Sequence, residues 1–222
     1  MVYSIHSPWT HHPDSGTMFG PDPETSGSIA NAWRTTNDIT NNFSATMNRA
    51  TTNDGFAKYA GPHGWNDPDM LEVGNAQISD AEGQSHFALW CLMKAPLLMG
   101  TDLTAASAAT LATLGNEGAI AINQDPLGVQ GTLRRQDPEG AFALWAGPLS
   151  HGCTAALAIN LGDAATLSVT ATFAELGINA AGAQASVVDV WTNKTVAGTA
   201  SGSVTFKIFV SHGNAFYRLC PI

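Results

Sequence analysis

Charge is scarce in this sequence. Only 12% of its 222 residues are Asp, Glu, Lys or Arg, and the formal net charge is −9. A protein that binds nucleic acid or an anionic membrane needs a basic surface, and no run of Lys or Arg provides one. No apolar stretch is long enough to span a bilayer, and the first residues lack the pattern of a secretory signal peptide. We therefore predict a globular protein with a neutral ligand, and neither nucleic acid nor membrane as a partner.

Cysteine is also rare. The three cysteines, Cys91, Cys153 and Cys220, lack metal-site spacing, and an odd number cannot pair completely. Cys91 lies in an apolar run, which favours a buried, inert thiol. Cys153 and Cys220, near strand ends of one domain, are predicted to form a disulfide if the protein is exported. Glycosylation sequons at Asn42 and Asn193 hint at an extracellular protein.

The pattern of the sequence changes near residue 130. Helical patterns alternate with short apolar strands before this point, and only short alternating runs separated by turn residues follow it. This predicts an α/β domain over 1–130 and an all-β domain, an antiparallel sandwich, over 131–222. A complete eight-unit barrel needs roughly 250 residues, about twice the length of the predicted α/β domain. Either the first sheet is small and open, or the chain is a piece of a barrel.

Local signals predict the elements of the first domain. A capping box over 79–82 predicts a helix that runs to about residue 94. We expect a buried strand over 97–99, an Ala-rich helix over 105–114 that ends at a glycine, and an apolar strand over 119–122. Such alternation with short connections is typical of βα units around a parallel sheet.

Two polar clusters carry the chemistry of the sequence. The cluster at 33–39 holds Arg34 and Asp38, and the cluster at 64–71 holds two carboxylates, one of them Asp69. Taken alone, each is read most simply as helix caps and a salt bridge. Together they place carboxylates on two loops, which is the minimum for glycoside hydrolysis, and they add the polar and apolar groups that a sugar pocket requires.

At these residues the sequence resembles glycoside hydrolase family twenty-seven, the α-galactosidases and α-N-acetylgalactosaminidases. Five segments agree with that family in order and spacing: 33–39, 64–71, 86–90, 95–100 and 121–128. The resemblance implies the C-terminal portion of a (β/α)₈ TIM barrel followed by an antiparallel β-sandwich. It also implies a retaining mechanism with two catalytic aspartates and no cofactor or metal. The adjacent pair His11 and His12 is accordingly interpreted as part of a solvated loop.

The resemblance assigns roles to individual residues. Asp38 matches the general acid/base, and Arg34 matches the residue that binds the sugar hydroxyl next to the anomeric carbon. Asp69 and Met70 match the wall of the sugar pocket. Ser7 lies near the position that sets specificity, so galactose and its N-acetylamino relative both stay open as substrates.

The family's nucleophile, an Asp on an earlier barrel strand, has no match in this sequence. We therefore expect a retaining α-galactosidase whose missing N-terminal barrel half is a required partner, and we expect this chain alone to be inactive. The alternatives are an α-N-acetylgalactosaminidase and a non-catalytic carbohydrate-binding remnant. Family habit implies an extracellular or a lysosomal or vacuolar location. The aglycone, and whether the protein forms a homodimer, stay open.

Overall fold

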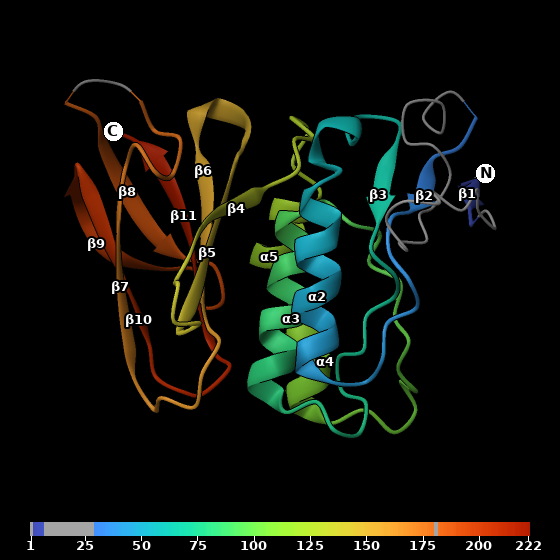
Figure 1. Ribbon diagram of the computed structural model, residues 1–222. Helices are drawn as coiled ribbons and strands as arrows, with labels where there is room; N and C mark the ends of the chain where they lie inside the picture. Colours follow the sequence, from blue (N-terminus) through green and yellow to red (C-terminus); the bar gives the residue numbers. More distant parts are fainter. Residues whose placement is uncertain (1, 7–28, 180–181) are drawn as a thin grey trace.

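The computed structural model describes residues 2–6, 29–179 and 182–222. These residues form stacked layers (Figure 1), with the helices lying between a short parallel sheet and a β-sandwich. The order of elements is α/β followed by all-β, as the sequence predicts.

The parallel sheet has the strand order β1-β2-β3, and its strands are short. They are β1 (Ser4–Ile5), β2 (Ala32–Arg34) and β3 (Trp65–Asp67). Both pairings are parallel, so the carboxyl ends of β2 and β3 meet at one edge of the sheet. An isolated parallel bridge between Leu71 and Met99 continues the pattern beyond β3.

The helix layer contains α2 (Phe43–Asp54), α3 (Asp80–Leu92), α4 (Ala108–Leu114) and α5 (Glu117–Asn123). A short 3₁₀ helix, Ala57–Tyr59, follows α2. Helix α3 is buried on almost every side because it contacts the other three helices and also the β-sandwich. A helix that is apolar around its whole circumference is expected in such a position.

The limits of α3 follow from its two caps. At the start, the Ser79 hydroxyl accepts from the N–H of Glu82, and a carboxylate oxygen of Glu82 accepts from the N–H of Ser79 at 2.8 Å. At the end, Lys94 has φ 59°, and the N–H of Ala95 donates to the carbonyl of Trp90. This Schellman arrangement ends the helix at Leu92, two residues earlier than predicted.

Two expected strands differ from the structure. The segment 119–122 belongs to α5, because the side chain of Asn116 caps a helix there by accepting from the N–H of Ala119. The segment 97–99 is extended, but it forms only the isolated bridge, and Leu98 and Met99 are 56% and 52% exposed. The predicted buried strand is therefore wrong. The helix expected over 105–114 begins three residues late, at Ala108, directly after the cap Ser107.

Eight antiparallel strands form the β-sandwich, which agrees with the sequence prediction. They are β4 (Thr132–Gln136), β5 (Phe142–Pro148), β6 (Thr154–Asn160), β7 (Leu167–Thr172), β8 (Gln184–Asp189), β9 (Lys194–Ser201), β10 (Ser203–Ile208) and β11 (Asn214–Pro221). A six-stranded sheet has the order β4-β5-β6-β11-β8-β9, and β10 pairs with β7. The last strand along the chain thus lies inside the larger sheet.

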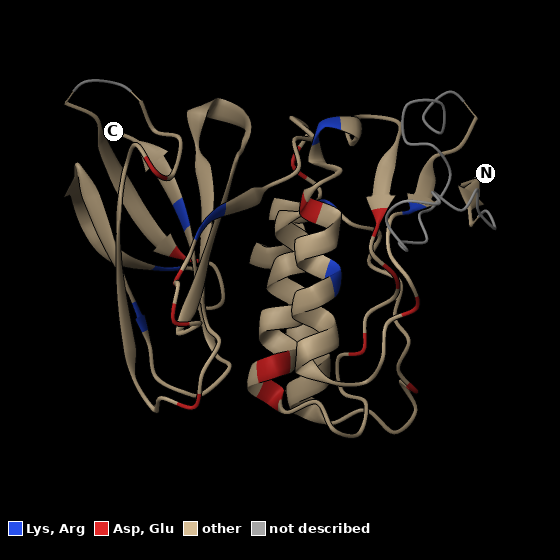
Figure 2. Cartoon of the chain, viewed as in Figure 1, with Lys and Arg blue, Asp and Glu red and all other residues tan. Residues whose placement is uncertain are grey.

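The six-stranded sheet separates two apolar cores. Trp145 and Leu157 face the helix layer and share a core with Phe87 and Leu89 of α3. The alternate residues of the same strands, such as Leu144, face β7 and β10 in a second core. Strands β5 and β6 are therefore apolar on both faces. Figure 2 shows that charged residues lie mainly in loops and near the ends of elements, away from these buried faces.

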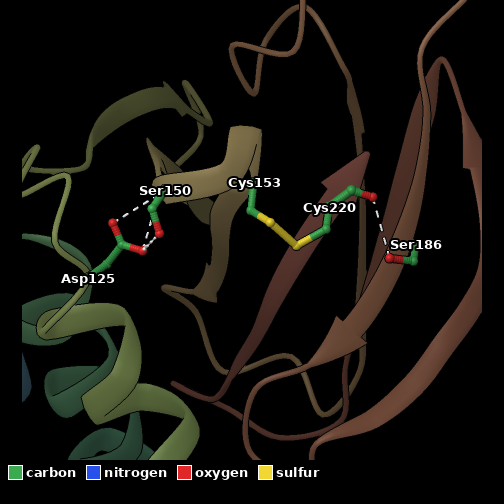
Figure 3. Close-up of a disulfide and its surroundings, with 5 residues drawn as sticks. All are labelled: Asp125, Ser150, Cys153, Ser186 and Cys220. Atoms are coloured by element: carbon green, nitrogen blue, oxygen red, sulfur yellow. Dashed lines mark hydrogen bonds between the residues drawn. A yellow bond between two sulfur atoms is a disulfide. The ribbon is translucent and has the colours of Figure 1, made fainter. Parts of the chain in front are cut away.

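Polar contacts and a disulfide fix the sandwich and attach it to the helices. Cys153 and Cys220 form a disulfide, as predicted, and Cys91 is free and buried. Near that disulfide the carboxylate of Asp125, after α5, accepts from the N–H and hydroxyl of Ser150 (Figure 3). Within the described ranges, no helix is both long and apolar enough to cross a membrane.

Candidate active site

The candidate site forms at the edge where β2 and β3 end. Arg34 is the last residue of β2 and lies opposite Asp67, the last residue of β3. The loops that follow are joined, because the N–H of Thr35 donates to the carbonyl of Asp67 at 2.9 Å and the hydroxyl of Thr36 donates to the carbonyl of Pro68 at 2.9 Å. In barrels of βα units, catalytic residues lie at this carboxyl-terminal edge.

Arg34 joins the two predicted clusters. Its Nη2 lies 3.2 Å from Oδ1 of Asp38 and 3.0 Å from Oδ2 of Asp69, and it also donates to the carbonyl of Thr36. The side chains of Arg34 and Asp69 are 11% and 10% exposed, whereas that of Asp38 is 85% exposed. A fixed guanidinium thus holds one buried carboxylate and one that solvent or a ligand can reach.

The guanidinium of Arg34 has unused capacity. Its Nε is buried and has no hydrogen-bond acceptor in the part of the chain that the structure describes. A buried N–H without an acceptor destabilises a protein by about 1–3 kcal/mol.

Asp69 has an unusual backbone conformation that several contacts support. Its φ is +92°, a region that non-glycine residues rarely adopt and that is common at functional sites. Its N–H donates to Oδ1 of Asp67 at 2.9 Å, and its carbonyl accepts from Nε1 of Trp90 at 2.7 Å. Its carboxylate accepts from the N–H of Met70 and from that of Ile39. The side chain is therefore fixed in place before any ligand binds.

Asp67 lies beneath the site. It is buried, and burial raises its pKa, although the N–H of Asp69 and the charge of Arg34 act in the opposite direction. Its observed contact supports the backbone of Asp69. The geometry thus gives Asp67 a supporting position.

One aromatic residue of the clusters, Trp33, turns away from the site. Trp33 is fully buried, and its Nε1 donates to Oδ1 of Asn66 at 2.8 Å. The amide of Asn66 then donates to the carbonyl of Phe56 and to Gln130, inside the protein. Since neighbouring strand residues face opposite ways, Trp33 points away from Arg34. Met70, at 43% exposure, does reach the surface.

Arg49 belongs to the site although neither cluster contains it. It lies on α2, and its Nη2 donates to the backbone carbonyl of Asp38 at 2.7 Å. Sequence patterns gave no signal for it, because an arginine inside a helix is usually a solvated surface residue. Only the fold, which places α2 beside the loop that precedes it, reveals the contact.

Some predicted residues cannot be located. Ser7, proposed near the specificity position, and the pair His11 and His12 lie outside the described residues. Among the residues that are described, no three His, Cys, Asp or Glu side chains are grouped as they would be around a metal ion.

A cavity of about 570 Å³ adjoins the site on another side. Its lining includes Asp67, Trp65 and Lys94, but not Arg34 or Asp38. Lys94 is buried, its Nζ donates to the carbonyl of Ile122, and burial lowers its pKa to about 8. Because the cavity excludes the paired charges of the site, we place the candidate chemistry at the loops after β2 and β3.

Comparisons with known proteins cover both parts of the chain. Residues 1–125 match the family described as "Alpha galactosidase A", and residues 139–219 match the "Alpha galactosidase C-terminal beta sandwich domain". The chain is 41% identical to an α-galactosidase of Oryza sativa over 195 residues, which covers 88% of this chain and 45% of that protein. It is 45% identical to α-galactosidase 2 of Arabidopsis thaliana over 175 residues, covering 78% of this chain and 43% of that protein.

A further relative has a different name. An α-N-acetylgalactosaminidase of Gallus gallus is 36% identical over 200 residues, covering 88% of this chain and 49% of that protein. Among solved structures, α-galactosidase I of Mortierella vinacea matches with a TM-score of 0.80 at 24% identity and covers 89% of this chain and 55% of that one. The structural match supports the fold. The chain spans about half the length of these relatives.

Proposed function

The chain belongs to the α-galactosidase family, and from that premise we propose that it is the C-terminal part of a retaining α-galactosidase that removes terminal α-D-galactosyl residues from galactosides and oligosaccharides. The observation that carries the proposal is the position of Arg34, which holds Asp38 and Asp69 together at the carboxyl-terminal edge of β2 and β3. We assign residues 1–130 to the barrel and 131–222 to the sandwich.

In the proposed mechanism Asp38 is the general acid/base. Its exposed carboxyl group donates a proton to the glycosidic oxygen as the first bond breaks, and it then removes a proton from the water that releases the sugar. Arg34 binds the hydroxyl next to the anomeric carbon through its guanidinium group. Met70 and Asp69 form the wall beside the sugar, and we assign Ser7 to substrate binding, near the position that sets specificity.

Retention requires a second carboxylate about 5 Å from the acid/base, placed to attack the anomeric carbon. Asp69 is an unsuitable candidate, because its oxygens already accept from Ile39, Met70 and Arg34. We propose that the nucleophile comes from a barrel segment outside these 222 residues. The two carboxylates would then approach the sugar from opposite faces.

One experiment tests the proposal. The 222-residue chain and a protein that joins it to the upstream barrel segment of a plant relative are assayed on nitrophenyl α-galactoside. We expect normal glycosidase turnover from the joined protein and negligible turnover from the chain alone, because proton donation cannot replace covalent catalysis. An inactive joined protein that folds would refute the proposal.

A second substrate is favoured by one relative, the α-N-acetylgalactosaminidase, so the nitrophenyl 2-acetamido sugar is assayed in parallel. We propose galactose as the preferred sugar because the plant relatives are α-galactosidases. The disulfide supports an oxidising compartment, and we infer an extracellular or a lysosomal or vacuolar location. Whether the complete protein is a homodimer is measured by gel filtration with light scattering.

A further inference from the structure

The peptide group between Asp38 and Ile39 is held at both ends by charged side chains. Its carbonyl oxygen accepts from Nη2 of Arg49 at 2.7 Å, and its N–H donates to Oδ2 of Asp69 at 2.7 Å. Arg49 lies on α2 and Asp69 lies in the loop after β3, so two separate elements hold one peptide plane. Hydrogen bonds to charged groups are shorter and stronger than neutral ones.

The loop that carries Asp38 needs such support. Residues 35–42 form neither helix nor strand, and the side chain of Asp38 is too exposed for packing to fix it. Its described side-chain contact is the one to Arg34 at 3.2 Å. If the peptide after Asp38 cannot rotate, the direction in which its side chain leaves the backbone is restricted. An error of about 1 Å in the placement of a catalytic group can lower a rate about 100-fold.

We propose that Arg49 and Asp69 are positioning residues that clamp the Asp38–Ile39 peptide and so aim the Asp38 carboxyl group. The proposal rests on the proposed function, in which Asp38 is the acid/base. The cluster holds two cations, Arg34 and Arg49, and two anions, Asp38 and Asp69. It has no net charge when all four are ionised. Arg49 acts through the backbone of Asp38 and requires no contact with the sugar.

The geometry of Arg49 itself supports this role. Its Nη1 donates to Oδ1 of Asn48 at 2.5 Å, on the same helix, while Nη2 reaches the carbonyl of Asp38. The guanidinium is therefore oriented from its own helix toward the loop. A lysine at this position keeps one donor for the carbonyl, whereas a glutamine is shorter and loses the charge.

The clamp is tested first in the 222-residue chain by NMR-detected hydrogen exchange. We expect the Ile39 amide to exchange at least about 10-fold faster than in the wild type in Arg49→Gln and in Asp69→Asn. In Arg49→Lys it should exchange near the wild-type rate. Amides of β5 and β6 should not change, which shows that the variants fold. Arg218→Gln, an exposed arginine of β11, is the matched control. Unchanged Ile39 exchange in both Arg49→Gln and Asp69→Asn overturns the clamp.

The aim of Asp38 is tested in the joined protein by comparing leaving groups. If the Asp38 carboxyl group is poorly aligned, cleavage slows most for substrates whose leaving group needs a proton. Arg49→Gln should therefore lower kcat/KM at least about 10-fold more on an alkyl or oligosaccharide galactoside than on nitrophenyl galactoside. KM should change little, and Arg49→Lys should restore most of the rate. An equal loss on all substrates, or no loss, overturns the positioning role. If the wild-type joined protein is inactive, the proposed function fails, while Ile39 exchange still decides the clamp.

Discussion

The two ends of the molecule use polar groups in different ways. At the loops after β2 and β3, charged side chains hold the backbone in an open arrangement, with Asp69 at φ +92° and Asp38 exposed to solvent. In the sandwich, apolar residues cover both faces of β5 and β6, and a disulfide joins Cys153 to Cys220. The difference suggests that Asp38 can be changed with little loss of stability, whereas changes in the core of the sandwich should lower stability. The predictions that follow test this separation.

The largest expected effect is on activity. In the joined protein, Asp38→Ala should lower kcat about 10²–10⁴-fold on substrates with poor leaving groups, because these need a proton from the acid. Nitrophenyl substrates should give a burst followed by slow turnover, and azide, which needs no base, should restore turnover and yield a β-galactosyl azide.

The stability of the Asp38→Ala variant also tests the comparison between site and sandwich. We expect the melting temperature to change little, since the Asp38 side chain is mostly in solvent. Uniform loss across leaving groups, absence of azide rescue and a clearly lowered melting temperature would together indicate a structural role for Asp38.

The next effect is on stability. Leu157 is fully buried in the core between β6 and the helix layer, so Leu157→Ala should destabilise the protein by about 2–5 kcal/mol in urea unfolding. Leu111→Ala, at a half-exposed leucine of α4, is the matched control and should change stability far less. If tryptophan fluorescence and circular dichroism give one transition, helices and sandwich unfold together. Two separate transitions would contradict the shared core.

The disulfide should have a similar or slightly smaller effect. Cys153 and Cys220 are 67 residues apart, and replacing both by Ser should lower the free energy of unfolding by about 2–4 kcal/mol. Thiol counting on the unfolded, non-reduced protein should find one thiol, Cys91. Three thiols would show that the bond does not form.

The smallest effect concerns Asp125. Burial alone would raise its pKa, but hydrogen bonds from Ser150 and Leu127, together with the charge of Lys94, outweigh burial and hold the pKa below its ordinary value. A lowered folded-state pKa gives stability that is present above the unfolded-state value of about 3.9 and is lost as pH falls through the folded-state value. Asp125→Asn should therefore destabilise the protein by about 1 kcal/mol at pH 7, given its partial exposure. The difference from wild type should shrink below about pH 4, whereas the exposed Asp163→Asn should show none at either pH.

Sequence reasoning succeeded where the signal was local. The Ser79 cap and its Glu82 partner determine where α3 begins, and alternating apolar residues indicate the sandwich strands. It failed at 119–122, where four apolar residues suit a strand or a helix equally and Asn116 decides the matter as a cap. It failed at 97–99 because burial depends on neighbouring strands that a short run cannot specify.

The residues of the candidate site likewise fall into those that the sequence predicted and those that it did not. Family resemblance located Arg34, Asp38 and Asp69, and the fold brings all three together. It did not find Arg49, eleven positions after Asp38, because a contact from a helix side chain to a loop carbonyl leaves no residue pattern. Nor did it separate Trp33 from the site, since the two faces of a strand as short as β2 cannot be distinguished by periodicity.

The position of β11 has a consequence for synthesis on the ribosome. This strand is the last of the eight along the chain, yet it lies between β6 and β8 and contributes Phe216 to the core under the helices. Until residues 214–221 have left the ribosomal tunnel, β6 and β8 each present an unpaired edge that can attract other chains. At roughly 5–20 residues per second the wait from β6 to β11 lasts several seconds. Chaperones that shield exposed strand edges should therefore raise the yield of this protein.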